Sequence, residues 1–346
     1  MNARGYVSIL IFLASTVQAA AQGFAGLGTE VDGYPLPDPT TEFSYPADHG
    51  PHPEFRIEWW YLTANLRGSD GEAYGIQWTL FRNAIRPGGA PNDQVWMGHA
   101  AISSPDGHFH AERFARGGIG QADVTASPFE AHIDEWSLKG PSLADVSLTA
   151  QGSDWAYDLA FTAEGPFVPQ GINGYSVKSD TGQASHYYSQ PFYTVDGTLT
   201  LPDGEISVSG SGWLDREWSS QPLAGNQSGW DWFSLHLEDG AKMMGFQLRN
   251  ADGAPYTTGT WITADGLPSP LAPEDISMAA KREASVAGRS IPVTWQIEVP
   301  SRGVDVTIDA IYDQSWMPTS VSYWEGPVSV TGSHRGRGYL EMTGYE

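Results

Sequence analysis

The sequence predicts an all-β protein built as two antiparallel β-barrels of similar construction that pack together. Three observations lead to this prediction: short segments alternate apolar and polar residues, Asp-Gly dipeptides recur between them, and two stretches of the chain resemble each other. The 346 residues include 40 glycines and 24 prolines, which suit many short strands and tight turns. There is no cysteine, so stability has to come from packed cores.

Alternation of period two marks the predicted strands. The clearest segments are residues 74–80, 155–161, 206–209, 293–299 and 304–310. Successive side chains of a strand point to opposite faces, so each segment has one apolar face to bury. Asp-Gly dipeptides, which favour hairpin turns, begin at residues 70, 106, 196, 203, 239, 252 and 265. Residues 275–286 have some helical character, but their β-rich surroundings favour a strand.

The two similar stretches are residues 59–83 and 230–250. Each runs from an aromatic cluster through a strand and an acidic-Gly turn to a G-x-Q strand that ends near an asparagine. This similarity predicts an internal duplication with a division near residue 200. The expected parts are a signal peptide (1–21), a flexible N-terminal segment (22–34), an N-terminal barrel (35–198) and a C-terminal barrel (199–346). A barrel of about eight strands can enclose one small ligand.

The first residues have the form of a secretion signal. A polar start with Arg4 precedes an apolar run over residues 6–17, and three alanines then offer a cleavage site before Gln22. The run is too short for a bilayer, which needs about 20 apolar residues. We therefore expect a periplasmic or secreted protein without stable membrane insertion.

The charge of the chain excludes some partners. Its 41 acidic and 18 basic residues give a net charge of −23, which repels nucleic acid and anionic membrane surfaces. Aromatic residues make up 12% of the sequence. They suit a flat, apolar ligand, but they also fill the cores of β-proteins, and composition alone does not separate these uses.

Common catalytic motifs are missing. The sequence has no G-x-S-x-G, no H-E-x-x-H and no Walker loop, and without cysteine it has no thiol nucleophile. His49 and His52 stand near carboxylates and could ligate a metal, with His99, His108 or His110 as a third ligand. Prolines on either side of His52 indicate an extended segment instead, where histidines cap turns. We expect neither a metal nor another cofactor.

One acidic segment has the pattern of a proton donor. If residues 213–218 are extended, Trp213, Asp215 and Glu217 share one face, and the alternate residues share the other. A carboxyl group between aromatic side chains loses hydration, which raises its pKa toward the range that a general acid needs. The alternative is an ion pair of Asp215 or Glu217 with an arginine at a strand end.

Five motifs resemble those of a known family. They are HPEFRIEWWYLTANL, SHYYSQP, GWLDREWSSQPL, GWDWFSLHLEDG and YWEGPVSVTGSHRGRGYLEMTGY. From about residue 35 to its end, the chain resembles the carotenoid 1,2-hydratase (hydroxyneurosporene synthase) family, in particular its secreted branch of predicted hydrolases. The resemblance implies two lipocalin-like barrels and a ligand of isoprenoid or polyketide character.

The resemblance also implies a site. Carotenoid hydratases use an H-x-W pair and a Y-x-D pair, to which His186 and Tyr188, and Trp213 and Asp215, correspond here. The aromatic identities are exchanged, so the carotenoid substrate does not carry over. We expect these four residues to be catalytic. Residues of the same motifs are expected to bind substrate: His52, Glu58, Trp60, Tyr61, Tyr187, Glu217, Trp230 and Trp232.

The sequence thus predicts a secreted protein that binds a hydrophobic, isoprenoid-like molecule and hydrates or hydrolyses it by acid catalysis from Asp215. The alternative is a periplasmic carrier without turnover, with a functional link to an ABC export system. A carrier has no use for a desolvated acid facing its cavity, so Asp215 separates the two. A metal-dependent hydrolase using His49 and His52 is a third hypothesis.

Overall fold

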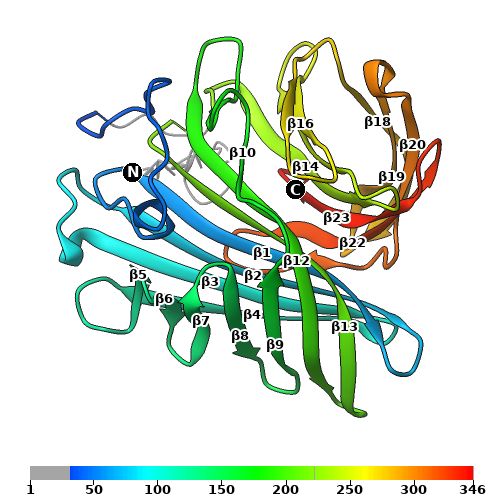
Figure 1. Cartoon of the computed structure of the whole chain (residues 1–346), viewed down its shortest axis with the longest axis horizontal. Helices are drawn as coiled ribbons and strands as arrows, with labels where there is room; N and C mark the ends of the chain where they lie inside the picture. Colours follow the sequence, from blue (N-terminus) through cyan, green and yellow to red (C-terminus); the bar gives the residue numbers. More distant parts are fainter. Residues whose placement is uncertain (1–31, 222, 346) are drawn as a thin grey trace, which may run out of the picture.

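The computed structural model describes residues 32–221 and 223–345, and this part of the chain is almost entirely β-strand (Figure 1). The only helices in the described part are three short 3-10 turns, η2 (Ala47–His49), η3 (Pro91–Asp93) and η4 (Pro300–Arg302). Within the same residues no helix is long and apolar enough to cross a membrane. The predicted all-β class is confirmed, whereas the predicted signal peptide lies outside the described residues.

The first sheet contains 13 antiparallel strands. They are β1 (Ile57–Gly68), β2 (Ala73–Ala84), β3 (Gln94–Ser104), β4 (Gly107–Arg116), β5 (Ala122–Ala126), β6 (Phe129–Ile133), β7 (Trp136–Ser142), β8 (Asp145–Gln151), β9 (Ala156–Ala163), β10 (Val168–Pro169), β11 (Tyr175–Val177), β12 (Ala184–Leu201) and β13 (Gly204–Ser219). Their order is β4-β3-β2-β1-β13-β12-β9-β8-β7-β6-β5, and β10 and β11 pair with β12.

The second sheet contains ten strands. They are β14 (Gln227–Leu237), β15 (Lys242–Asn250), β16 (Tyr256–Ile262), β17 (Pro268–Leu271), β18 (Ser277–Val286), β19 (Arg289–Val299), β20 (Val304–Ala310), β21 (Trp316–Met317), β22 (Tyr323–Gly332) and β23 (Gly336–Thr343). Their order is β17-β16-β15-β14-β23-β22-β20-β19-β18, with β21 against β22. Residues 275–286, assigned to a strand from their surroundings, mostly form β18. Figure 1 shows both sheets curled into barrel-like bodies that pack together.

The predicted duplication is visible in the way each sheet closes. In the first sheet the first strand, β1, lies between β2 and the last strand, β13; in the second, β14 lies between β15 and β23. The two similar stretches of sequence form the hairpins β1–β2 and β14–β15. The likeness extends to the closing hairpins, because YYSQP at 187–191 corresponds to YWEGP at 323–327, and GWLD at 212–215 corresponds to GYLE at 338–341.

The chain changes sheets later than the sequence predicts. The predicted division near residue 200 falls in the turn between β12 and β13, and both of these strands belong to the first sheet. Gly204 follows Asp203 in this turn with φ +134°, so the Asp-Gly dipeptide makes a hairpin and not a linker. The passage to the second sheet lies between Ser219 and Gln227.

Apolar side chains fill the interior of each barrel. Trp60, Trp78 and Trp136 are fully buried in the first, and Trp295 and Trp324 in the second. A third apolar cluster lies between the two sheets. Side chains thus pack the interior of both barrels, and a cavity remains at the interface between the sheets.

Candidate functional site

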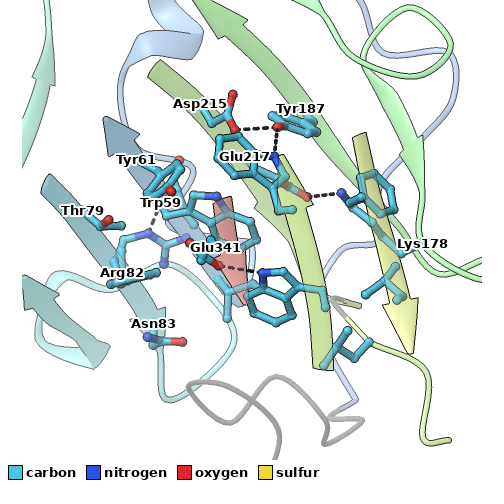
Figure 2. A pocket seen from close by; sticks show the side chains of 18 residues that line it. Trp59, Tyr61, Thr79, Arg82, Asn83, Lys178, Tyr187, Asp215, Glu217 and Glu341 are labelled. Atoms are coloured by element: carbon cyan, nitrogen blue, oxygen red, sulfur yellow. Dashed lines mark hydrogen bonds and ion pairs between the residues drawn. The ribbon is translucent and has the colours of Figure 1, made fainter. Parts of the chain in front are cut away.

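A cavity of about 90 Å³ lies between the two sheets, several times the space that one water molecule needs. Strands β1, β2, β12 and β13 border it on one side, and β14, β15 and β23 on the other. Its walls are largely aromatic, with Trp59, Tyr61, Phe81, Tyr187, Trp230, Trp232 and Phe246. Figure 2 shows that three carboxyl groups, those of Asp215, Glu217 and Glu341, enter this aromatic space.

Asp215 is the most tightly held of the three. It lies on β13, and its carboxyl group accepts hydrogen bonds from the hydroxyl of Tyr187 at 2.6 Å, the hydroxyl of Ser189 at 2.5 Å and the indole N–H of Trp213 at 2.6 Å. Burial raises the pKa of Asp215 to about 7, although these three hydrogen bonds oppose the rise; the nearby Glu217 carboxylate adds to it. The carboxyl group is therefore partly protonated at neutral pH.

The arginine ion pair considered as an alternative for Asp215 is not formed, since the groups that bind its carboxyl are neutral donors. Glu217, two residues further along the same face, has a cation as partner. Its carboxylate lies 2.8 Å from the ammonium of Lys178 and accepts a hydrogen bond from Ser185 at 2.5 Å. Lys178 also stacks over the rings of Tyr187 and Phe246. Glu217 is thus held in an ion pair.

Glu341 is the counterpart of Asp215 in the second half of the chain. Asp215 lies opposite Tyr61 of β1, and Glu341 lies opposite Trp232 of β14, at equivalent points of the two sheets. Burial raises the pKa of Glu341 to about 7, and the charges of Asp215 and Glu217 raise it further, while a hydrogen bond of 2.6 Å from the Trp230 indole opposes the rise. The cavity therefore contains two acids that are both near half-protonation at neutral pH.

A fourth carboxyl group stands next to Glu341. Glu325 lies directly opposite Glu341 on β22, and Tyr61 donates to it at 2.5 Å. Burial, with the neighbouring charge of Glu341, raises the pKa of Glu325 well above its ordinary value and so favours the protonated form. Two carboxyl groups opposite each other on one sheet face do not ionise together without a large cost.

Eight of the predicted site residues lie at this cavity or in the cluster around it. Seven of them border the cavity, namely Glu58, Tyr61, Tyr187, Asp215, Glu217, Trp230 and Trp232. Trp213 lies in the apolar cluster between the sheets and bonds Asp215. Residues 213–218 are extended in β13, so Trp213, Asp215 and Glu217 share one face as predicted.

The structure separates His186 and Tyr188 from Asp215. On β12, Tyr187 pairs with Glu217 and Ser189 with Asp215, so His186 and Tyr188, which alternate with these two residues, point to the opposite face. The ring of His186 accepts a hydrogen bond from the backbone N–H of Asp38 at 3.3 Å. The hydroxyl of Tyr188 lies 2.6 Å from His49. The four residues matched to the hydratase pairs therefore do not form one site.

His52 and Trp60 do not border the cavity, and the carboxylate of Glu58 is held in ion pairs. Glu58 borders the cavity, but its carboxylate binds Arg82 at 2.8 Å and Arg216 at 2.6 Å, and His52 lies 2.8 Å away. Burial alone would raise the pKa of Glu58, but the two guanidinium groups hold it well below its usual range. Trp60 is buried in the first barrel beneath Arg216. These residues form a buried ionic cluster.

His49 and His52, the two histidines considered first as metal ligands, have other partners. His49 contacts Tyr188, and burial lowers the pKa of its imidazole to about 4. His52 stacks on Trp218, with ring centroids 3.9 Å apart. Among residues 32–221 and 223–345, no group of three or more metal-ligating side chains is placed to hold an ion.

The sequence prediction missed Trp59, Lys178, Glu325 and Glu341. Three of the four carry a signal that could have been used. Trp59 precedes a predicted site residue and lies on the same face as Tyr61. Glu341 and Glu325 appear once the repeat is extended to the closing hairpins, where they take the places of Asp215 and Ser189. Lys178 lies in a loop between β11 and β12, where no pattern points to it.

Known proteins resemble the chain in sequence and in fold. A family model described as AttH-like matches residues 36–345. The crystal structure of a candidate AttH from Nitrosomonas europaea has 32% sequence identity and a TM-score of 0.83, over 90% of this chain and 99% of that one. Kievitone hydratase from Nectria haematococca has a TM-score of 0.67 at 15% identity, over 91% of this chain and 95% of that one, and shares the fold. No curated protein matches in sequence.

Proposed function

The chain belongs to the AttH-like family, and from this premise we propose that it binds an apolar, isoprenoid-like small molecule between its two sheets and adds water to it by acid catalysis from Asp215. The observation that carries the proposal is the setting of Asp215. Its carboxyl group is buried, has a pKa of about 7 and borders a cavity with aromatic walls. A carrier needs no such acid, whereas a reaction that begins with proton transfer does.

The chemistry that fits these residues is hydration of an alkene. Asp215 gives its proton to one alkene carbon, and the other carbon becomes a cation. The faces of Trp59, Trp232 and Tyr61 attract a cation, by about 0.5–2 kcal/mol each. Water then attacks the cation and gives its second proton to the carboxylate of Glu341. One water is added in total, Asp215 ends deprotonated and Glu341 ends protonated.

Two further observations support this choice. The fold likeness to kievitone hydratase makes hydration the reaction to examine first, although that likeness extends to fold alone. The surface of the cavity is also mostly apolar, although Thr79, Arg82 and Asn83 line it beside the carboxyl groups and the Lys178–Glu217 pair. A ligand there would be recognised by its apolar body, which is what an isoprenoid chain offers.

The proposal is tested with Asp215→Asn, which keeps the shape of the side chain and removes the proton. Prenylated phenols and acyclic isoprenoids are incubated with the protein in H₂¹⁸O, and mass spectrometry reports a gain of one labelled water. We expect Asp215→Asn to lower the rate by about 10²–10⁴-fold while leaving ligand affinity nearly unchanged. Asp158→Asn, an exposed site on β9, is the matched control.

Two outcomes would overturn the proposal. Near-wild-type turnover by Asp215→Asn would remove the acid from the mechanism. Absence of any labelled product from the wild-type protein, together with a hydrophobic molecule that co-purifies with it, would favour the carrier in the periplasm. Label in a product of bond cleavage would indicate hydrolysis instead of hydration.

A further inference from the structure

A row of hydrogen-bonded side chains leads from the protein surface to the cavity. It begins at Glu112 on β4, whose carboxylate lies 3.0 Å from Nε2 of His99 on β3. Nδ1 of His99 lies 3.0 Å from the hydroxyl of Tyr323 on β22. Tyr323 hydrogen-bonds Glu325, to which Tyr61 donates at 2.5 Å from the opposite side. Tyr61 is part of the cavity wall (Figure 2).

The row crosses the interface between the sheets at a place where polar groups are costly. Its inner members are almost completely buried, with 0% exposure for His99 and 1% for Tyr323 and Glu325. The side chain of Glu112 is 20% exposed, so the row has one end in solvent. Apolar residues would pack the same interface without the cost of burying polar groups. The arrangement therefore indicates a use beyond packing.

We propose that Glu112, His99, Tyr323, Glu325 and Tyr61 form a proton path between solvent and the cavity. Each inner member can accept a proton from one neighbour and donate a different proton to the next. The net result is the transfer of one proton along the row, inward or outward, and no bond to carbon changes. Burial lowers the pKa of His99, which keeps its imidazole neutral and able to accept at one nitrogen and donate from the other. Burial raises the pKa of Glu325 and favours the protonated form, which can donate.

The path lies next to Glu341, whose protonation state has to be restored after each reaction. Its use in turnover rests on the proposed function, in which each cycle leaves Asp215 without a proton and Glu341 with one. Glu325 stands directly opposite Glu341 on the neighbouring strand, so a proton on Glu341 has a neighbour connected to solvent. The first half of the chain has Ser189 at the place of Glu325, and the same row cannot form there.

The path itself can be tested without substrate. Infrared spectroscopy detects the C=O stretch of a protonated carboxyl group, and the band of Glu325 is identified by its loss in Glu325→Gln. After transfer into D₂O, the rate at which this band shifts measures proton exchange at Glu325. We expect His99→Gln, which keeps polar atoms but does not relay protons, to slow this exchange about tenfold or more, because exchange then has to wait for local opening.

His108→Gln is the matched control, since His108 is a half-buried histidine on β4 that contacts Ser103 and Met317 outside the row. It should leave the exchange rate of Glu325 unchanged. Glu112→Gln, at the partly exposed end, gives a second test if His99→Gln does not fold, and should also slow the exchange. Unchanged exchange in both row variants would overturn the path. Slowing by Tyr61→Phe in place of His99→Gln would also overturn it, because protons would then enter through the cavity.

Failure of the path and failure of the proposed function give different results. If the wild-type protein hydrates no alkene but His99→Gln slows exchange at Glu325, the path stands and the proposed reaction does not. If hydration depends on Asp215 while exchange at Glu325 is indifferent to His99 and Glu112, the reaction stands and the path does not. If both hold, His99→Gln should lower kcat and leave KM nearly unchanged.

Discussion

The two halves of the molecule place a carboxyl group at the same point of the fold but surround it differently. Asp215 in the first half is held by three neutral donors, whereas Glu341 in the second half has one, the Trp230 indole. Where the first half has Ser189, the second has Glu325. The duplicated framework therefore provides two buried acids, and their neighbours distinguish them: Asp215 is oriented by its donors, and Glu341 shares its face with another acid.

The opposite faces of the same strands show a second difference. In the first half, Glu58 binds Arg82 and Arg216, and all three side chains are buried beneath the segment that precedes β1. In the second half, Asp231 binds Arg249, whose side chain is 19% exposed. Solvent can therefore relieve part of the cost of an unpaired charge in the second half, and it cannot do so in the first.

The largest effect we expect comes from breaking these ionic clusters. Glu58→Gln should lower the free energy of unfolding by about 3–5 kcal/mol, since it leaves two guanidinium groups buried with too little negative charge. Asp231→Asn should lower the free energy of unfolding by only about 1–3 kcal/mol, because Arg249 reaches water. Urea unfolding at pH 7 measures both. An equal or larger loss in Asp231→Asn would show that the halves do not differ in this way.

A smaller effect is expected in the pH dependence of stability. The folded protein raises the pKa of Asp215 from 3.8, and that of Glu341 from 4.5, to about 7. Each group therefore contributes stability that is present below its unfolded pKa and is lost as pH rises through 7. The side chains introduced by Asp215→Asn and Glu341→Gln cannot ionise. From pH 4 to pH 8, the free energy of unfolding of each variant should therefore rise by about 2–4 kcal/mol relative to that of the wild type.

Urea unfolding across this pH range measures the gain, and Asp158→Asn serves as the control without a buried acid. A gain for Asp215→Asn alone would mean that Glu341 is ionised at neutral pH, and the two halves would then differ in charge as well as in neighbours. A gain for neither variant would contradict the raised pKa values.

The sequence predicted the fold well because a strand with one buried face alternates apolar and polar residues with a period of two. Residues 293–299 and 304–310 form β19 and β20, and the alternation along 213–218 placed Asp215 and Glu217 together. Alternation along one strand, however, does not show which strand lies beside it or in what register the two pair. The match to the two hydratase pairs could not reveal that Tyr188 lies opposite Arg216, and hence on the face away from Asp215.

The rest of the site depends on contacts between distant parts of the chain. Glu341 and Trp230 border the same cavity as Trp59 only because the two barrels pack face to face. No local pattern encodes that packing. The division between sheets was misplaced for a related reason, since an Asp-Gly turn inside a sheet and a connection between sheets look alike in one sequence. The repeat, followed into the closing hairpins, is the one signal in the sequence that pairs Asp215 with Glu341.

The smallest expected effect tests whether the donors around Asp215 distinguish it from Glu341. The Tyr187 hydroxyl donates to the carboxylate and stabilises the charged form, so Tyr187→Phe should raise the pKa of Asp215 above about 7. One lost hydrogen bond of about 1 kcal/mol corresponds to a rise of about one pH unit. Infrared titration of the Asp215 carboxyl band, identified by its loss in Asp215→Asn, measures the midpoint. Trp230→Phe should move the midpoint of Glu341 upward in the same way and leave that of Asp215 nearly unchanged. If Tyr187→Phe left the Asp215 midpoint in place or lowered it, the three donors would serve to orient the carboxyl group without adjusting its proton affinity, and burial alone would set the acid strength in both halves.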